Sequence, residues 1–257
     1  MQPNPQQLGI LKAALFALCL VPLAQLGWLA WTDSLGANPI ELVTRHLGTW
    51  ALNFLLISLA VTPLRHLSGW HWLLRLRRLL GLYAFFYATL HFLTYLWLDQ
   101  FFDWAAIVKD IAKRPFITAG FTAFVLLIPL AATSNAAALK RLGGRRWTQL
   151  HRSVYAIAII GVIHYWWLVK KDITLPLLYA VLLGALLGFR AFRLSRERQR
   201  QLATYYRPRC SRRKRAICFA RLAFLPRGWW APPFFSRGST ATGLRGLMWR
   251  CLALFIS

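Results

Sequence analysis

Acidic residues are scarce in this chain, with 7 Asp and Glu against 32 Lys and Arg among 257 residues. The net charge of +25 would suit a nucleic-acid-binding protein, but it is unevenly distributed. Residues 1–194 carry 18 basic against 6 acidic residues, and residues 195–257 carry 14 against 1. Basic loops between apolar segments explain the first excess, so no nucleic-acid partner is expected for this part.

Several sequence motifs of soluble redox enzymes are also missing. The four cysteines, at 19, 210, 218 and 251, include no CxxC pair, which argues against a structural zinc site or an iron–sulfur cluster. There is no GxGxxG, no P-loop and no large polar segment that could form a nucleotide-binding domain. Any nicotinamide chemistry must therefore be done by another protein.

Long apolar runs dominate the chain instead, because 58% of its residues are hydrophobic and only 15% are charged. Six runs are long enough, or nearly so, to cross about 30 Å of hydrocarbon: about 10–31, 47–64, 79–98, 116–133, 153–170 and 173–192. The first lacks a small-residue cleavage site, which favours a spanning helix over a removable signal peptide. The sequence predicts an all-α polytopic membrane protein, a six-helix transmembrane bundle in residues 1–200.

Basic residues predict the orientation of this bundle, because cytoplasmic loops are enriched in Lys and Arg. The segments at 65–78 and 140–152 and the region beyond residue 192 are basic, whereas those at 33–45, 99–114 and 170–172 are nearly balanced. We therefore expect both termini on the cytoplasmic side of a bacterial inner membrane.

The segment 201–257 differs from the rest. From residue 207 it has no acidic residue and no helical or alternating period. It fits an arm that binds anionic lipid or RNA, and it equally fits a disordered or wrong-frame tail, so no function is assigned to it.

Three histidines stand in or beside apolar runs. His91 interrupts LLGLYAFFYATLHFLTYLWL (79–98), His164 interrupts SVYAIAIIGVIHYWWLV (153–169), and His151 precedes the second run. Ionisable residues within a membrane are costly and usually functional, and neutral imidazole is a common ligand of metals and haem iron. We interpret all three as candidate haem ligands.

His91 and His164 are predicted to lie at matching depth. His91 follows Arg78 by 13 residues and His164 follows Arg152 by 12, so both lie roughly 18–20 Å from the inner basic belt. Two imidazoles at one level in the outer half of the membrane suit a six-coordinate b-type haem, and the absence of CxxCH agrees with non-covalent binding. The alternative for either residue is a hydrogen bond between helices.

His151 precedes His164 by 13 residues, about 19 Å along a helix, which suits a second, cytoplasmic-side cofactor. An ideal helix would set the two side chains some 140° apart, so a common face needs a bend or a non-helical start near His151. A second haem would need another ligand, such as His66 or His71, or would be five-coordinate. The alternative is an interfacial residue that pairs with phosphate or propionate.

Other polar residues near these histidines have a simpler interpretation. His46, like His66 and His71, is expected at the surface near a loop. Tyr87 and Tyr95 flank His91 at i−4 and i+4 and are expected to pack, although they could line a cofactor pocket. Five arginines could bind haem propionates or a flavin phosphate, but their role in topology is sufficient: Arg77, Arg78, Arg145, Arg146 and Arg152.

Four segments together resemble one known family: RRLLGLYAFFYATLHFLTY (77–95), KRLGGRRWTQLHRSVYAIAIIGVIHYWW (140–167), TPLR (62–65) and LGANPIE (35–41). They are similar to the haem-binding membrane subunit of the bacterial protein-methionine-sulfoxide reductase system, the MsrQ/YedZ family. This family belongs with the ferric-reductase-like transmembrane domains that also include NADPH oxidases. The similarity extends from about residue 8 to about residue 200.

The resemblance implies a non-catalytic redox subunit. Members take electrons from the quinone pool or a cytoplasmic flavin reductase and pass them through b-type haem, with FMN also reported. They deliver them to a periplasmic molybdopterin catalytic subunit, forming a heterodimer that reduces methionine sulfoxide in oxidised envelope proteins. The matching ligand positions are His91, His151 and His164, for one haem b or two, and no FMN ligand can be transferred.

Two other functions remain open from the sequence. One is a ferric or superoxide-generating reductase of the same fold, against which the missing nicotinamide domain and the incomplete set of histidine pairs argue. The other is a transporter or assembly factor whose histidines relay protons or bind a metal transiently. Broken helices or internal repeats would favour the latter, and neither is seen.

Overall fold

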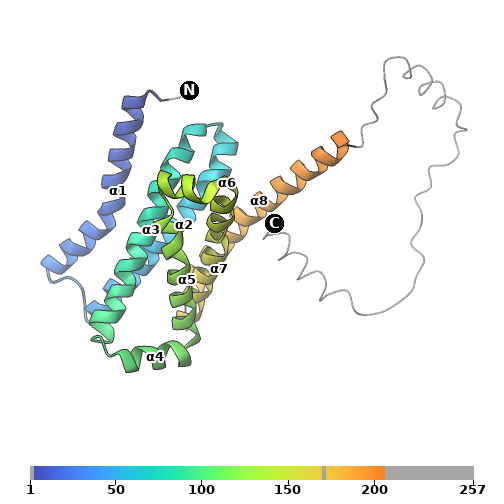
Figure 1. The fold of residues 1–257 in the computed structure, drawn as a ribbon. Coiled ribbons are helices and arrows are strands. Elements are labelled where there is room, and N and C mark those ends of the chain that lie inside the picture. The colour runs from blue at the N-terminus through green and yellow to red at the C-terminus, as the bar shows by residue number, and fades with distance from the viewer. Residues whose placement is uncertain (1–2, 170–171, 206–257) are drawn as a thin grey trace, which may run out of the picture. The chain divides into compact units, whose positions relative to one another are not determined.

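The computed structural model describes residues 3–169 and 172–205, and the tail beyond residue 205 lies outside the described residues. Helices dominate, and no strand occurs in the described ranges. The elements (Figure 1) are α1 (Pro5–Trp31), α2 (Pro39–Ser68), the 3₁₀ turn η1 (His71–Leu73), α3 (Leu74–Thr94), the π-helical turn η2 (Tyr95–Asp99), α4 (Trp104–Lys113), α5 (Pro115–Ala132), α6 (Ala136–Arg152), α7 (Val154–Leu168) and α8 (Thr174–Tyr205).

The all-α polytopic membrane architecture predicted from the sequence is confirmed. Five helical segments are long and apolar enough to cross a membrane: Pro5–Trp31, Pro39–Ser68, His71–Asp99, Pro115–Ala132 and Thr174–Leu202. The predicted run at 153–170 corresponds to α7, which has 15 residues and is short for a hydrocarbon core that needs about 20. The basic segment before it, residues 140–152, lies in α6, and neither α6 nor α7 is among these five segments.

A break near His151 is found between α6 and α7. Gly143 interrupts α6 with a φ of 74°, a left-handed conformation that glycine adopts without steric cost. From Gly144 the backbone is helical to Arg152, and Ser153 stays in the right-handed region before α7 begins. A single residue, Ser153, therefore separates the helical turn that carries His151 from the start of α7.

Local sequence signals set the ends of α2, which has 30 residues. Pro39 occupies the first turn, where its missing N–H is not needed, and the Asn38 side chain accepts a hydrogen bond from the backbone N–H of Glu41. At the other end, Gly69 adopts the left-handed conformation and its N–H donates to the Arg65 carbonyl. The polar caps thus lie just outside the apolar run.

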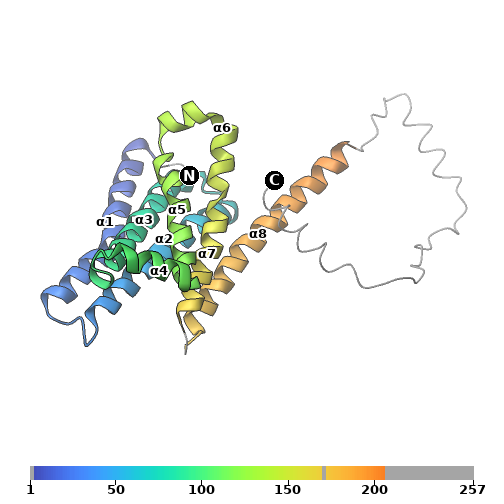
Figure 2. The same cartoon turned by 60° about the horizontal axis from the view of Figure 1, so that its bottom comes forward.

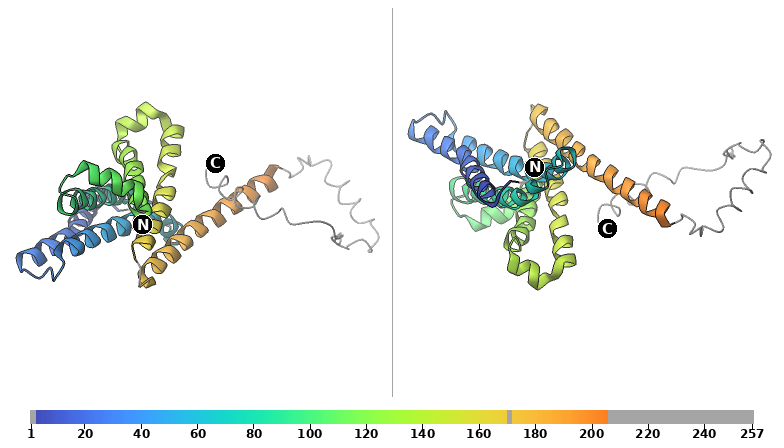
Figure 3. Two further views of the ribbon diagram at one scale, coloured as in Figure 1. Left: turned by 90° about the horizontal axis from the view of Figure 1, so that it is seen from below. Right: turned by 90° about the horizontal axis from the view of Figure 1, so that it is seen from above.

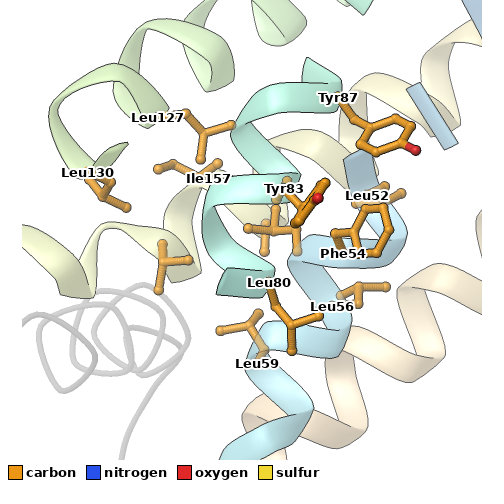
Figure 4. Close-up of a cluster of buried hydrophobic side chains, with 14 of the residues drawn as sticks. Leu52, Phe54, Leu56, Leu59, Leu80, Tyr83, Tyr87, Leu127, Leu130 and Ile157 are labelled. Atoms are coloured by element: carbon orange, nitrogen blue, oxygen red, sulfur yellow. The ribbon is translucent and has the colours of Figure 1, made fainter. Parts of the chain in front are cut away.

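Two helix pairs form the centre of the unit of residues 1–189: α2 packs along α3, and α5 packs along α7. Figure 4 shows their buried side chains meeting, and Figure 3 shows α5, α6 and α7 to one side of the α2–α3 pair from below and from above. The residues labelled in Figure 4 are Leu52, Phe54, Leu56 and Leu59 of α2, Leu80, Tyr83 and Tyr87 of α3, Leu127 and Leu130 of α5, and Ile157 of α7.

Helix α1 is attached to α3 by two tyrosines. The hydroxyl of Tyr87 donates to the Cys19 carbonyl at 2.8 Å, and that of Tyr83 donates to the Phe16 carbonyl at 3.0 Å. Tyr87 is fully buried, with 0% of its surface exposed, so its hydroxyl needs this partner. Packing is therefore the role of Tyr87 in this structure.

Two segments that the sequence predicts to be loops contain helices. The 99–114 segment contains α4, which begins where the Asp103 carboxylate caps the N–H of Ala106, and the 134–152 segment contains α6. Figures 1 and 2 show α4 across the ends of α3 and α5, and α6 at the opposite end of α5. Between η2 and α4, Phe101 and Phe102 both have positive φ, 47° and 60°. Such values are rare for bulky residues.

Candidate functional site

The structure brings two of the three candidate ligands together. The imidazole of His91, from α3, faces that of His164, from α7, with ring centroids 6.2 Å apart and ring planes at 72°. Each ring is partly buried. The two rings, which the spacing predicts at one level, are therefore neighbours, and they lie where the α2–α3 pair meets the α5–α7 pair.

Each ring is anchored by one nitrogen. His91 Nδ1 lies 2.9 Å from the Thr44 carbonyl oxygen on α2, and His164 Nδ1 lies 2.6 Å from the Phe116 carbonyl oxygen on α5. A carbonyl oxygen only accepts hydrogen bonds, so Nδ1 must carry the proton in both rings. The lone pair of each neutral imidazole then resides on Nε2, the nitrogen that remains for a metal.

Each ring also lies on a glycine, one helical turn beyond its carbonyl partner. A Cβ atom added to Gly48 would lie 3.0 Å from His91 Cε1, and one added to Gly120 would lie 2.8 Å from His164 Cε1. These glycines and carbonyls were missed in the sequence. Their signal was a glycine inside an apolar run, which in membrane helices marks a close approach by a neighbour.

The helix pairs approach each other next to this site. A Cβ atom on Gly161 of α7 would lie 3.6 Å from Leu52 Cδ1 of α2, an ordinary van der Waals distance. Gly161 precedes His164 by three residues, and Leu52 follows Gly48 by four. The helices α2 and α7 therefore pass close to each other within about one turn of the histidines.

The geometry of the two rings fits a metal bound between them. Metal–imidazole bonds of about 2.0–2.1 Å place two opposed nitrogens about 4 Å apart, and the added distances to the ring centres give about 6 Å between centroids. The observed 6.2 Å agrees with this value. Two neutral imidazoles are donors that suit haem iron. Within residues 3–169 and 172–205, no group of three or more His, Cys, Asp or Glu could hold a metal.

His151 occupies a different environment. Its Nε2 lies 3.1 Å from the Thr133 hydroxyl, which itself lies 2.6 Å from the Pro129 carbonyl oxygen. Because the hydroxyl proton goes to that carbonyl, His151 donates from Nε2. Its ring stacks on Trp147, with centroids 4.0 Å apart. Burial, and then the positive charge of Arg77, lower the pKa of His151 below its ordinary value.

The remaining histidines divide. His66 and His71 are exposed, in agreement with the expected surface location. The expectation was wrong for His46, which is half-buried because its Nε2 lies 3.0 Å from the Pro22 carbonyl oxygen of α1. Tyr95, one turn beyond His91, has a buried hydroxyl for which no hydrogen-bond partner is found in the described part of the chain.

A groove of about 510 Å³ lies along α5 and α7, lined by Ala112, Lys113, Pro115, Thr118, Ala119, Thr122, Ile160 and Trp167. Ile160 precedes His164 by four residues and Trp167 follows it by three. These spacings put the three residues on one face of α7. The groove is thus an apolar surface beside His164, with the Lys113 ammonium at its border.

Comparisons with known proteins agree with this architecture. Residues 47–162 match the family described as "Ferric reductase like transmembrane component". A protein of Azospira oryzae named "Protein-methionine-sulfoxide reductase heme-binding subunit MsrQ" is 62% identical over 190 residues, which are 74% of this chain and 82% of that protein.

Proteins of the same name give similar values in two other species. That of Herminiimonas arsenicoxydans is 55% identical over 192 residues, 74% of this chain and 88% of the relative. That of Ralstonia nicotianae is 55% identical over 190 residues, 73% of this chain and 88% of the relative. No solved structure matches the chain. Because such identity extends over more than four fifths of each of these relatives, the chain belongs to the MsrQ family of ferric-reductase-like membrane proteins.

Proposed function

We propose that this protein is the haem-bearing electron-transfer subunit of a protein-methionine-sulfoxide reductase system, with His91 and His164 as the axial ligands of one b-type haem. The observation that carries the proposal is the pair of facing imidazoles, 6.2 Å apart between centroids, each anchored through Nδ1 to a carbonyl of a neighbouring helix. The names of the relatives, which are heme-binding subunits, support the same assignment.

The chain's own residues would prepare such a site in three ways. The Nδ1–H bonds to Thr44 and Phe116 fix the tautomer, orient the rings and raise the basicity of Nε2. The surrounding apolar helices exclude water. A b-type haem held there supplies one-electron exchange at a potential set by its axial ligands and by burial.

The location of the histidine pair favours an electron acceptor on the periplasmic side of the membrane. His164 lies four residues before the end of α7, and His91 lies eight residues before the end of η2, the ends that the basic-loop pattern assigns to the periplasm. We therefore infer transfer to a periplasmic molybdopterin-containing subunit that repairs methionine sulfoxide in envelope proteins. Both termini would be cytoplasmic, in a bacterial inner membrane.

For the electron donor we favour membrane quinol over a cytoplasmic flavin reductase. The groove beside His164 is large enough for an aromatic head group, since ligand pockets typically measure about 300–1,000 Å³. Trp167 offers it a stacking surface and Lys113 a hydrogen-bond donor to a quinone oxygen. Substitution of Trp167 by alanine should then slow reduction by quinol without loss of haem.

His151 is proposed to serve a second, inner-side cofactor, which would be a further haem or FMN. The neighbouring Arg77 charge, which acts on His151, would suit a propionate or a phosphate. In the observed arrangement Nε2 is occupied by Thr133. Ligation of iron through that nitrogen therefore requires the Thr133 bond to open, whereas a purely electrostatic role does not.

The visible spectrum of the purified protein tests the proposed function. A reduced-minus-oxidised haem b difference signal, reoxidised on addition of the periplasmic subunit and methionine sulfoxide, is expected. A haem signal that is reoxidised by ferric iron or oxygen, but not by that subunit, would support a ferric or superoxide-type reductase. The absence of haem from folded protein expressed with ample haem supply would favour a transporter or assembly factor.

A further inference from the structure

We infer that Gly48 and Gly120 are positioning residues that set the orientation of the two axial histidines and, through it, the properties of the bound haem. The inference rests on the proposed ligation by His91 and His164. Neither glycine would touch the iron. Each acts through the imidazole that lies on it.

The space between each glycine and its imidazole is too small for a methyl group. Added Cβ atoms would approach His91 to 3.0 Å at Cε1 and 3.1 Å at Nδ1, and His164 to 2.8 Å at both atoms. Real Cβ atoms almost never come closer than 3.0 Å to another heavy atom, so alanine at position 120 would force the ring or a helix to move. At position 48 the ring would have to give by a few tenths of an ångström.

The same glycines lie next to the carbonyl groups to which the rings are hydrogen-bonded. Gly48 follows Thr44 by four residues and Gly120 follows Phe116 by four, so each glycine is one helical turn beyond the carbonyl that holds the ring. Only a residue without a side chain at that position lets the edge of an imidazole descend to the helix backbone. The close approach of the ring to the glycine and the hydrogen bond from its Nδ1 therefore depend on each other. The same arrangement occurs twice, once on α2 and once on α5.

The orientation of the two imidazole rings affects the midpoint potential and the EPR signal of a haem that they ligate. A ring lifted from its carbonyl loses basicity at Nε2, which favours the reduced over the oxidised haem and raises the midpoint potential. The present planes are 72° apart. Nearly perpendicular axial imidazoles give a strongly anisotropic low-spin ferric EPR signal, and rotation of either ring toward the other would reduce that anisotropy.

The two positions should not respond equally. His164 has both the shorter hydrogen bond, 2.6 Å against 2.9 Å, and the closer approach to its glycine. Gly120→Ala is therefore expected to change the spectrum and potential more than Gly48→Ala. A general effect of added bulk in membrane helices would not reproduce this order.

The experiment compares these variants with two matched controls, Gly81→Ala on α3 and Gly161→Ala on α7. An added Cβ meets nothing within 4 Å at Gly81 and only an ordinary contact at Gly161, and these helices carry His91 and His164. Haem per inserted protein, the ferric EPR signal and the midpoint potential are measured on each purified full-length chain. We expect wild-type values in both controls, a raised potential and altered EPR signal in Gly48→Ala, and larger shifts or about 10-fold weaker haem binding in Gly120→Ala.

Glycine variants that match their controls in EPR signal, potential and haem content would overturn the inference, while the wild-type haem signal would leave the proposed ligation intact. Conversely, wild-type protein whose haem survives replacement of both histidines would contradict the proposed function itself. Should Gly120→Ala insert poorly, Gly48→Ala carries the test. Failure of both to accumulate in membranes that accept the controls would assign the glycines to helix packing instead.

Discussion

The His91–His164 pair, which we propose to lie on the outer side of the membrane (the outer pair), and His151 show how differently one residue type can be held in one membrane protein. His91 and His164 are anchored through Nδ1 to backbone carbonyls, and their Nε2 atoms remain for a ligand. His151 is anchored through Nε2 to the Thr133 hydroxyl, and its ring is covered by Trp147. The first arrangement leaves the nitrogen that commonly binds iron available, and the second occupies it.

The hydrogen-bond partner of a histidine matters as much as its depth, because the partner determines which ring nitrogen is left for a metal. A helix carbonyl has two lone pairs, so it can hold an imidazole at little cost to the helix. A threonine hydroxyl on a neighbouring helix can rotate away and is the more easily exchanged partner. The outer pair can therefore bind a metal without losing its anchoring bonds, whereas His151 must give up its Thr133 bond to ligate through Nε2.

Replacement of either outer histidine should have the largest effect. His91→Ala or His164→Ala removes one of the two proposed haem ligands, and haem content should fall by more than about 10-fold, because even the loss of an outer-shell partner costs about 10–100-fold in affinity. Haem per inserted protein, measured by absorbance, gives the answer. The exposed His71→Ala is the control, and full haem retention in both outer variants would contradict the assignment.

His151→Ala should have a smaller and separable effect. If His151 serves an inner-side cofactor, its removal should lower the content of that cofactor, or electron transfer from donor to acceptor, while the outer haem keeps its spectrum. Haem stoichiometry, flavin content and transfer rates are measured on one preparation. Unchanged values in all three would reduce His151 to an interfacial residue and leave the outer pair as the working site.

The outer pair was predictable from sequence because it depends on depth, and depth follows from counting residues along helices of known rise. Helical periodicity likewise predicts that a common face for His151 and His164 needs a bend or a non-helical start near His151, and α6 ends and α7 begins on either side of Ser153. The support of the rings was not predictable. Gly48 and Gly120 lie 43 and 44 residues from the histidines they contact, and only the tertiary pairing of helices brings them together.

The fold, too, was predictable from sequence only in part. Apolar length identified the spanning helices, whereas α4 and α6 were missed because their sequences are charged enough to resemble loops. Both have polar faces and N-caps from Asp103 and Asn135, a short-range signal that was available. The occupation of His151 Nε2 by Thr133 could not be anticipated, because it depends on how α5 and α6 meet.

Thr133→Val sharpens the comparison further. It removes the hydroxyl that accepts from His151 Nε2, and the loss of such a bond should lower the free energy of unfolding by about 1 kcal/mol. The measurement is thermal stability in detergent, with Thr148→Val as control, because that exposed hydroxyl bonds only to a carbonyl of its own helix. Cofactor content should not fall; a fall would mean that the Thr133 bond is part of the occupied inner site.

The smallest effect is expected from removal of the segment after Gln201. The chain is patterned through about residue 200, and residues 201–257 combine 11 basic residues with no acidic residue and no period. Such a segment has no evident way to offset the conformational entropy lost on ordering, although its apolar stretches at 229–235 and 247–256 could adsorb to a membrane surface.

A chain truncated after Gln201 should therefore insert, bind haem and reduce the periplasmic subunit as the full chain does. The three quantities are membrane yield, haem per protein and the rate of reoxidation by that subunit. Loss of haem would place the segment in the folding of the bundle, and loss of reoxidation alone would make it a component of partner binding, contrary to its assignment as a dispensable tail.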